Sequence, residues 1–283
     1  MFVYVILHFR TLDITKMCVE HLLSTIPDSK IVIVDNGSGD GSGQELQRTY
    51  AHCGNISIIL SPDNVGFAKG NNIGYKYAVD TYNPDYVVVM NNDVLIDQNI
   101  EPLIDSYMTQ NGIDVCGPDI LTPDGDHQNP LLRKPFSTPR LIKQIIIDYV
   151  RLTCLRLKIF HNRILGTYKN VVKKYHNANS TASNVSNCIL HGSCLIYGRN
   201  YLSKSPYAFV PVTFLYGEEM ILFDYIQRLG LSSGVCGSAQ VMHLGGKSTD
   251  TGGNLRERQI RKMECVIDSM YQQIKLRIGK ATC

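Results

Sequence analysis

The feature that most restricts the fold of this chain is an alternation of two kinds of segment over its first 120 residues. Short, continuous apolar runs at 3–7, 31–34 and 86–90 are typical of strands buried on both faces of a sheet. Between them lie segments with a helical spacing of apolar residues, for example 15–25 and 68–81. This alternation predicts an α/β fold with a mostly parallel sheet.

Polar residues gather where these predicted strands end. His8 follows the first strand, the segment 35–40 follows the second, and the segment 91–93 follows the fourth. In open α/β sheets, ligands bind beyond the carboxyl ends of the strands. The sequence therefore predicts a ligand site at this edge of the sheet.

Composition excludes several other classes of protein. The chain has 283 residues, of which 44% are hydrophobic and 19% charged, so it can bury a full core and is not a disordered chain. Its length suits one large domain or two small ones. No two of the nine cysteines are spaced CxxC, which argues against a zinc cage and favours a reducing compartment. We find no signal peptide, and no apolar stretch approaches the roughly 20 residues of a membrane helix.

A strongly basic block interrupts the second half of the chain. Residues 133–176 contain eleven Lys and Arg and one acid, Asp148, although the whole chain has a net charge of only +3. A helical projection places one set of apolar residues opposite one set of cations. The apolar set is Ile142, Ile145, Ile146, Tyr149, Leu152 and Phe160, and the basic set is Arg140, Lys143, Arg151 and Lys158.

Such a basic amphipathic helix indicates binding to an anionic membrane surface. The plainer alternative is a surface helix that packs on the core. We do not expect nucleic acid as a partner, since no recognition module accompanies the charge.

Three short motifs carry the candidate chemistry. The first, IVIVDNGSGDGS at 31–42, ends a strand with Asp35, which could accept hydrogen bonds from a base or a ribose. It contains neither GxGxxG nor a phosphate loop, and an ordinary surface turn remains the alternative.

The second motif, DNVGFAKGNNIGYKYA at 63–78, packs three glycines and three asparagines ahead of a helix. Exposed backbone N–H groups at such a turn suit phosphate or sugar hydroxyls. Asn72 and Gly74 are unfavourable inside a helix, so we interpret them as a close approach to a ligand.

The third motif, VVVMNNDV at 87–94, delivers Asn91, Asn92 and Asp93 at the end of a strand. One carboxylate with amide neighbours suits a hard divalent ion shared with a diphosphate.

In this order, the three motifs resemble the inverting family 2 glycosyltransferases of the GT-A fold. The resemblance is closest to rhamnosyltransferase-like members that build bacterial surface polysaccharides such as capsule or O-antigen. Residues 64–74 reproduce the family pattern Asn-x-Gly-Phe-Ala-x-Gly-Asn-Asn-x-Gly at every position, and 91–93 is similar to its Asp-x-Asp metal motif. The resemblance is strong over residues 3–120.

Two later segments extend the resemblance. The family's Phe-x-Tyr-x-Glu-Asp segment, whose second acid is the base, reads Phe214-Leu-Tyr216-Gly-Glu218-Glu219 here. The Asp and Arg that usually follow are displaced to Asp224 and Arg228, which leaves the base as Glu219 or Glu218. The family's Val-x-His-x-Gly-Gly-x-Ser run matches 241–248 and implies that His243 is a metal ligand. The segment His191-Gly192-Ser193 resembles the strand that lines the acceptor side.

The resemblance implies a nucleotide-diphospho-sugar transferase, Rossmann-like, with a mixed sheet flanked by helices and a basic helical insertion. Its reaction would move a sugar, with inversion, from a dTDP- or UDP-linked donor to a glycan or lipid-linked oligosaccharide. Asp93 and His243 would hold Mn²⁺ or Mg²⁺. The residues expected to bind the donor are His8, Phe9, Asp35, Asn36, Gly66, Phe67, Gly70, Asn71, Asn92, Arg256, Arg258 and Arg261.

We expect a nucleotide-sugar-binding half at 1–120, a basic helical insertion at 121–187, an acceptor and catalytic half at 188–253, and a terminal helix at 254–283. The expected location is cytoplasmic, peripheral at the inner face of the membrane, and the oligomeric state stays open. Two alternatives remain: a nucleotidyltransferase, and a catalytically inactive membrane-associated subunit that binds glycan or nucleotide.

Overall fold

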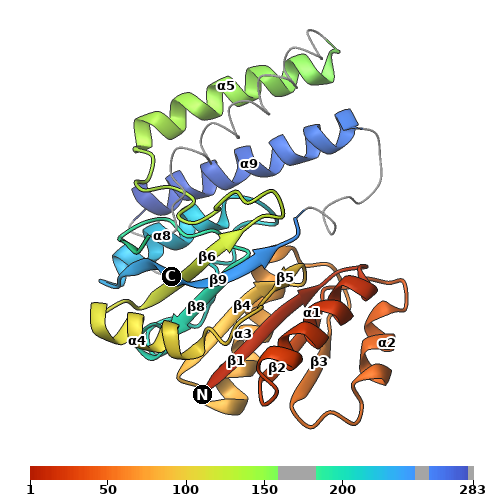
Figure 1. Cartoon of the computed structure of the whole chain (residues 1–283). Helices are drawn as coiled ribbons and strands as arrows, with labels where there is room; N and C mark the ends of the chain where they lie inside the picture. The colour runs from red at the N-terminus through yellow and green to blue at the C-terminus, as the bar shows by residue number, and fades with distance from the viewer. Residues whose placement is uncertain (159–182, 246–254, 280–283) are drawn as a thin grey trace.

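The computed structural model describes residues 1–158, 183–245 and 255–279 (Figure 1). Its strands all belong to one mixed sheet. They are β1 (Phe2–His8), β2 (Lys30–Asp35), β3 (Ile56–Leu60), β4 (Tyr86–Asn91), β5 (Val94–Leu95), β6 (Val115–Leu121), β7 (Val185–Ser186), β8 (Cys194–Gly198) and β9 (Ser233–His243). The helices are α1 (Leu12–Thr25), α2 (Ser42–Thr49), α3 (Phe67–Tyr82), α4 (Glu101–Asn111), α5 (Thr138–Arg156), α7 (Arg199–Leu202), α8 (Glu218–Arg228) and α9 (Leu255–Ile278).

The first half of the sheet is parallel, as its apolar runs predicted. The strand order is β3-β2-β1-β4-β8-β6-β9-β5, and β7 pairs with β9. His8 pairs with Asp35, and Leu7 pairs with Asn91. The carboxyl ends of β1, β2 and β4 therefore meet at one edge, and the predicted α/β class is confirmed.

The second half of the sheet mixes directions. β8 runs antiparallel to both β4 and β6, whereas β9 runs parallel to β6. β9 begins at Ser233, where the small residues of 233–239 hide any apolar alternation in the sequence. Its last residue, His243, pairs with Val94 of the short strand β5.

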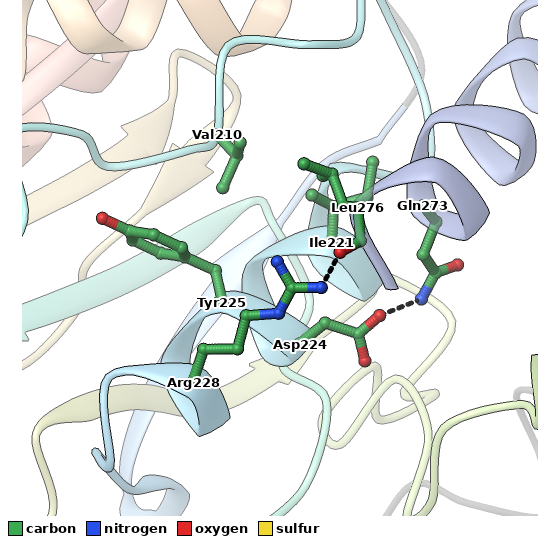
Figure 2. A pocket seen from close by; sticks show the side chains of 7 residues that line it. All are labelled: Val210, Ile221, Asp224, Tyr225, Arg228, Gln273 and Leu276. Carbon is green, nitrogen blue, oxygen red and sulfur yellow. Dashed lines mark hydrogen bonds between the residues drawn. The ribbon is translucent and has the colours of Figure 1, made fainter. Parts of the chain in front are cut away.

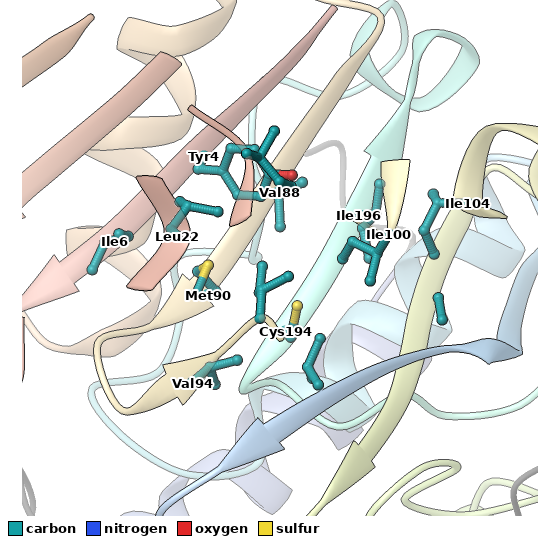
Figure 3. Packing of buried hydrophobic residues seen from close by; sticks show 14 of the residues in the cluster. Tyr4, Ile6, Leu22, Val88, Met90, Val94, Ile100, Ile104, Cys194 and Ile196 are labelled. Carbon is teal, nitrogen blue, oxygen red and sulfur yellow. The ribbon is translucent and has the colours of Figure 1, made fainter. Parts of the chain in front are cut away.

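Helices cover both faces of the sheet, so the chain forms three layers (Figure 1). Alternate residues of β1 point to opposite sides: Tyr4 and Ile6 pack with α1 and α4, while Val3 and Val5 pack with α3 and α8. Figure 3 shows the first of these cores. Because β1, β2 and β4 are buried on both faces, their sequences read as continuous apolar runs.

The basic amphipathic segment forms α5, which lies against α9 at one end of the molecule (Figure 1). Leu152 and Leu155 of α5 pack with Met263 and Ile267 of α9, and Ile145 joins them. Ile142, Ile146 and Tyr149 stay exposed. The apolar stripe predicted from the sequence is therefore divided, since two of its five described members, Ile145 and Leu152, pack on α9. Phe160 lies outside the described residues.

The predicted basic face is also reduced by pairing within the protein. Arg151 lies 2.9 Å from Asp148, and Arg156 lies 2.6 Å from Glu264 of α9. Within the described ranges, no helix is both long and apolar enough to cross a membrane.

Candidate active site

Asp93 and His243 come together at the end of the sheet. Pairing of β5 with β9 places them side by side, and the backbone N–H of Leu244 donates to the Asp93 carbonyl at 2.9 Å. The His243 Nε2 atom lies 3.3 Å from Asp93 Oδ1. That carboxylate oxygen is buried and has no hydrogen-bond partner.

A buried carboxylate oxygen without a hydrogen bond is unfavourable by about 1–3 kcal/mol or more, and a bound cation would offset this cost. Carboxylate oxygen and imidazole nitrogen are both ligands for divalent metals. The pair therefore fits the metal implied by the sequence. No group of three or more His, Cys, Asp and Glu residues gathers in the part of the chain that the structure describes. Beside these two residues, the donor diphosphate and water are oxygen ligands that such an ion commonly takes.

The acid pair begins α8. Glu218 is buried and accepts a hydrogen bond from the Thr213 hydroxyl at 3.2 Å. Burial raises the pKa of Glu218 to about 8, with help from the neighbouring charge of Glu219. At neutral pH this carboxyl mostly carries a proton, which makes it a poor base.

Glu219 is half-buried and faces Gly192. A Cβ atom added to Gly192 would lie 2.8 Å from Glu219 Oε1, so any larger residue there would force the carboxylate to shift. Burial raises the pKa of Glu219, and the backbone N–H groups of Glu219 and Gly192 oppose that shift. The next residue toward the N-terminus, His191, has its ring centroid 5.7 Å from that of His243. Glu219 is thus linked to the Asp93–His243 pair through the adjacent residues Gly192 and His191.

The donor-side turn lies beside the acid segment. The Phe67 N–H donates to the Phe214 carbonyl at 2.7 Å, and a Cβ atom on Gly66 would lie 2.5 Å from the same oxygen. Gly66 has a φ of +87°, which also favours glycine. These contacts join the second motif to the segment that carries Glu219.

The interpretation of Asn72 and Gly74 as ligand contacts is wrong. A Cβ atom on Gly74 would lie 2.4 Å from Val5 Cγ1 and 2.8 Å from Val34 Cγ2, so glycine is needed for packing of α3 on the sheet. The Asn72 side chain donates to the Phe209 carbonyl at 2.7 Å and accepts from the backbone N–H of Ala208 at 2.9 Å. Both residues hold the fold together.

Gly70 and Asn71 also lie inside the packed helix. A Cβ atom on Gly70 would lie 2.8 Å from Leu7 Cδ1. Asn71 is buried and donates to the Phe67 carbonyl at 3.0 Å, while its Oδ1 has no partner. Asn71 therefore keeps one unsatisfied polar atom near the donor-side turn.

The direct contact predicted between the His8 side chain and the nucleotide is also wrong. His8 is fully buried, with Nδ1 2.7 Å from Thr15 Oγ1 and Nε2 2.8 Å from Ser42 Oγ. Its burial lowers the pKa, which keeps the ring neutral. With both nitrogens engaged, His8 supports the edge of the sheet from within.

Three further polar side chains of the predicted donor site make hydrogen bonds to other groups of the protein. Asp35 Oδ1 accepts from the backbone N–H of Ser38 at 3.2 Å, which closes its own turn. Asn36 donates to Asn64 Oδ1 at 3.1 Å. Asn92 donates to Thr15 Oγ1 at 2.8 Å. These contacts shape the loops of the site.

Arg10 is a residue of this edge that the sequence did not predict. Its guanidinium lies 4.9 Å from the centroid of the Phe9 ring, and its Nε donates to the Ser38 carbonyl at 3.1 Å. Phe9 itself is half-buried. The sequence offered little signal, since Arg10 is a single cation in a loop with no motif.

Of the arginines expected to bind the donor, Arg256 makes its hydrogen bonds to α5 instead. Its Nε donates to the Leu155 carbonyl at 2.8 Å and its guanidinium also donates to the Arg156 carbonyl at 2.7 Å. Arg256 therefore caps the end of α5, where carbonyls lack partners within the helix. Arg258 and Arg261 are exposed on α9, and their assignment stays a prediction.

With this geometry in place, comparison with known proteins decides the family. The profile described as "Glycosyl transferase family 2" matches residues 3–182, more than half of the 283-residue chain.

The chain belongs to glycosyl transferase family 2.

Its mixed sheet with helices on both faces is the GT-A fold expected for this family. Two curated relatives are similar. The low-salt glycan biosynthesis hexosyltransferase Agl10 of Haloferax volcanii is 25% identical over 216 residues, which cover 76% of this chain and 59% of Agl10. The glycosyltransferase GlyG of Streptococcus pneumoniae is 24% identical over 99 residues, covering 35% of this chain and 32% of GlyG. Thus the chain spans less than two thirds of either relative.

The structure explains where this family 2 chain departs from the usual acid segment. Asp224 binds Arg277 of α9 at 2.6 Å. It also accepts from Gln273 at 2.8 Å (Figure 2). Arg228 donates to the Leu276 carbonyl. The displaced Asp and Arg thus join α8 to α9, around a small pocket that Val210, Ile221 and Tyr225 help to line.

Proposed function

We propose that the protein is a metal-dependent inverting glycosyltransferase. It moves a sugar from a nucleotide-diphosphate donor, dTDP- or UDP-linked, to a hydroxyl of a glycan acceptor during polysaccharide synthesis. Family membership supports the reaction class. The name of Agl10, a hexosyltransferase of glycan biosynthesis, supports a hexosyl or rhamnosyl donor.

One observation carries the proposal. The buried Oδ1 of Asp93 has no hydrogen-bond partner and lies 3.3 Å from His243 Nε2, at the sheet edge where ligands bind. Asp93 and His243 would hold Mn²⁺ or Mg²⁺. When bound, the ion supplies positive charge that stabilises the departing diphosphate.

Glu219 is the proposed base. It accepts the proton of the acceptor hydroxyl while that oxygen bonds to the anomeric carbon and the nucleoside diphosphate leaves from the opposite face. A single displacement of this kind inverts the anomeric configuration and needs no enzyme nucleophile. Glu219 suits this role better than Glu218, because it is partly exposed beside Gly192, whereas Glu218 is buried.

The donor would lie between the ends of β1 and β2 and the turn at 66–67. Phe9 offers a half-buried aromatic face for stacking, and Arg10 places a cation beside it. Asn71 Oδ1 is the buried polar atom that could accept a donor hydroxyl after a small shift.

The decisive experiment measures donor turnover by the purified protein against UDP-, dTDP- and GDP-sugars, with Mn²⁺, Mg²⁺ or a chelator. Metal-dependent release of sugar from one donor is the expected result, and NMR of a transferred product should give the inverted anomer. Release of pyrophosphate would instead indicate nucleotidyl transfer. Turnover that survives complete chelation would overturn the metal assignment.

We further propose that the protein works as a peripheral protein on an anionic membrane surface, at the cytoplasmic face, where a lipid-linked acceptor would be elongated. The supporting feature is the outer side of α5. Ile146 and Val150 each keep 60% of their surface exposed, and Tyr149 keeps 56%. Lys143 is exposed on the same helix. Apolar side chains beside cations suit reversible attachment to anionic lipid.

A further inference from the structure

The segment 127–129, near the beginning of the basic insertion, contacts the candidate metal pair through Gln128 and His243. Three consecutive side chains each make a different contact. His127 Nδ1 lies 2.7 Å from Asp119 Oδ1, Gln128 Oε1 lies 2.7 Å from His243 Nδ1, and Asn129 donates to the Pro118 carbonyl at 2.7 Å. None of His127, Gln128 and Asn129 belongs to the motifs that carried the family resemblance.

Gln128 is held firmly by its neighbours. Its backbone N–H donates to the Ile120 carbonyl of β6 at 2.8 Å. On one side, His127 is anchored to the fully buried Asp119, which also accepts from Gln240 at 3.2 Å. On the other side, Asn129 is fully buried and accepts from the backbone N–H of His191 at 2.8 Å. The Gln128 amide therefore reaches His243 from a rigid base.

The contact between Gln128 and His243 determines which ring nitrogen carries the proton. An amide oxygen only accepts hydrogen bonds, so the Nδ1 atom that faces it must donate. A neutral imidazole has one N–H, which leaves a lone pair on Nε2. That lone pair faces Asp93 Oδ1 at 3.3 Å. In this tautomer, Nε2 has no hydrogen to donate to the Asp93 carboxylate, so the two atoms do not hydrogen-bond to each other. A cation is the partner that suits both.

We propose that Gln128 is a positioning residue that holds His243 as its Nδ1–H tautomer, with the Nε2 lone pair directed at the metal position. This inference rests on the proposed function in one respect, namely that a divalent metal binds between Asp93 and His243. Ligating histidines generally donate their other N–H to an oxygen, which fixes the ring and increases its basicity. Gln128 would serve this purpose from a segment far from His243 in sequence.

The test compares wild type with Gln128→Met, which keeps the length of the side chain and removes the acceptor, and with Gln128→Glu, which keeps an acceptor oxygen. Gln98→Met is the matched control, because Gln98 also contacts β9, donating to the Ser238 carbonyl at 3.3 Å, away from His243. Two measurements are made: the imidazole ¹⁵N shifts of His243 in metal-free protein, and the Mn²⁺ dissociation constant by EPR with saturating UDP or dTDP.

Wild type and Gln98→Met should show the Nδ1–H tautomer and equal Mn²⁺ affinity. Gln128→Met should shift the ring toward Nε2–H and weaken Mn²⁺ binding by about 10–100-fold. Gln128→Glu should restore binding to the wild-type level or better, which a general loss of packing would not allow.

A wild-type ring with its proton on Nε2, or a Gln128→Met protein that binds Mn²⁺ as tightly as wild type, would overturn the role of Gln128. A wild type with the Nδ1–H tautomer that binds no Mn²⁺ would contradict the proposed metal site and leave the tautomer assignment supported. The two failures are therefore distinguishable.

Discussion

Nε2 of His243 lies 3.3 Å from Oδ1 of Asp93, and no hydrogen bond satisfies that carboxylate oxygen. The two residues come from distant parts of the chain and meet because β5 pairs with the end of β9. An arrangement that is unfavourable without a ligand is typical of a functional site. Two consequences can be measured on one variant.

Asp93→Asn should separate stability from function. Replacing a buried, unpaired carboxylate with a neutral amide that can donate to His243 Nε2 should raise the melting temperature of the metal-free protein. The same change should reduce transfer by roughly 10³-fold, because the ion supplies several kcal/mol of charge stabilisation. Calorimetry with and without Mn²⁺ and nucleotide checks both effects. Equal stabilisation of wild type and variant by Mn²⁺ would contradict the assignment.

The acid pair allows a test of the base. Glu219→Gln should lower kcat by about 10²–10⁴-fold while donor affinity persists, since it removes basicity and keeps shape. Glu218→Gln is the matched control and should keep most of the activity, because Glu218 already carries a proton at neutral pH. The assignment is reversed if Glu218→Gln is the inactive variant.

Glu218 should also make the stability of the fold depend on pH. Burial raises its pKa from 4.5 to about 8, so between these values the folded protein binds a proton that the unfolded chain has released. This contribution is complete below pH 4.5 and is lost as pH rises toward 8. As pH rises through this range, the unfolding free energy of wild type should therefore fall relative to that of Glu218→Gln, by up to about 1.4 kcal/mol per pH unit. Urea unfolding at several pH values measures the difference, and parallel curves would refute it.

Gly74→Ala should destabilise the fold without touching the donor site. The added methyl would lie 2.4 Å from Val5 Cγ1, and overpacking of this kind costs about 1–3 kcal/mol. Gly54→Ala is the control, since a Cβ atom there meets nothing within 4 Å. Denaturant unfolding should separate the two variants, whereas donor affinity of the folded protein should match wild type. Weaker donor binding by folded Gly74→Ala would favour the ligand interpretation of this glycine.

Membrane attachment should depend on the outer side of α5. The protein should pellet with anionic liposomes at low salt, ignore neutral ones, and be released by high salt. Ile146→Asp with Tyr149→Asp should abolish pelleting and spare donor binding. Met17→Asp, at a residue of α1 with 37% exposure, is the control and should pellet like wild type. Equal recovery of the double variant would indicate that this surface serves another purpose.

Much of the fold was predictable because its central strands are buried on both faces. The apolar runs at 31–34 and 86–90 lie within β2 and β4, and α9 lies within the terminal helix expected at 254–283. The prediction was less successful for strands that show neither an apolar run nor an alternation of apolar and polar residues. The strand β9 begins at Ser233, among small residues, and β5 has only two residues.

The candidate site was predictable in its chemistry and only partly in its geometry. Motifs at 64–74, 91–93 and 241–248 indicate donor, metal and histidine positions through residue type and spacing alone. They do not reveal that His8 is buried, that Arg256 caps α5, or that Gln128 contacts His243. These contacts join segments far apart in the chain, and no local pattern records them.

By itself, the sequence determined the α/β class, the order of its elements and the residue types needed for a nucleotide-sugar site, because period and motif are local properties. Only the tertiary structure decided which of those residues face one another. It brought Asp93 to His243, left Glu219 half-buried and Glu218 buried, and divided the apolar residues of α5 between α9 and solvent. The physical reason is that a side chain's partner depends on strand register and helix packing, which arise from contacts between distant segments.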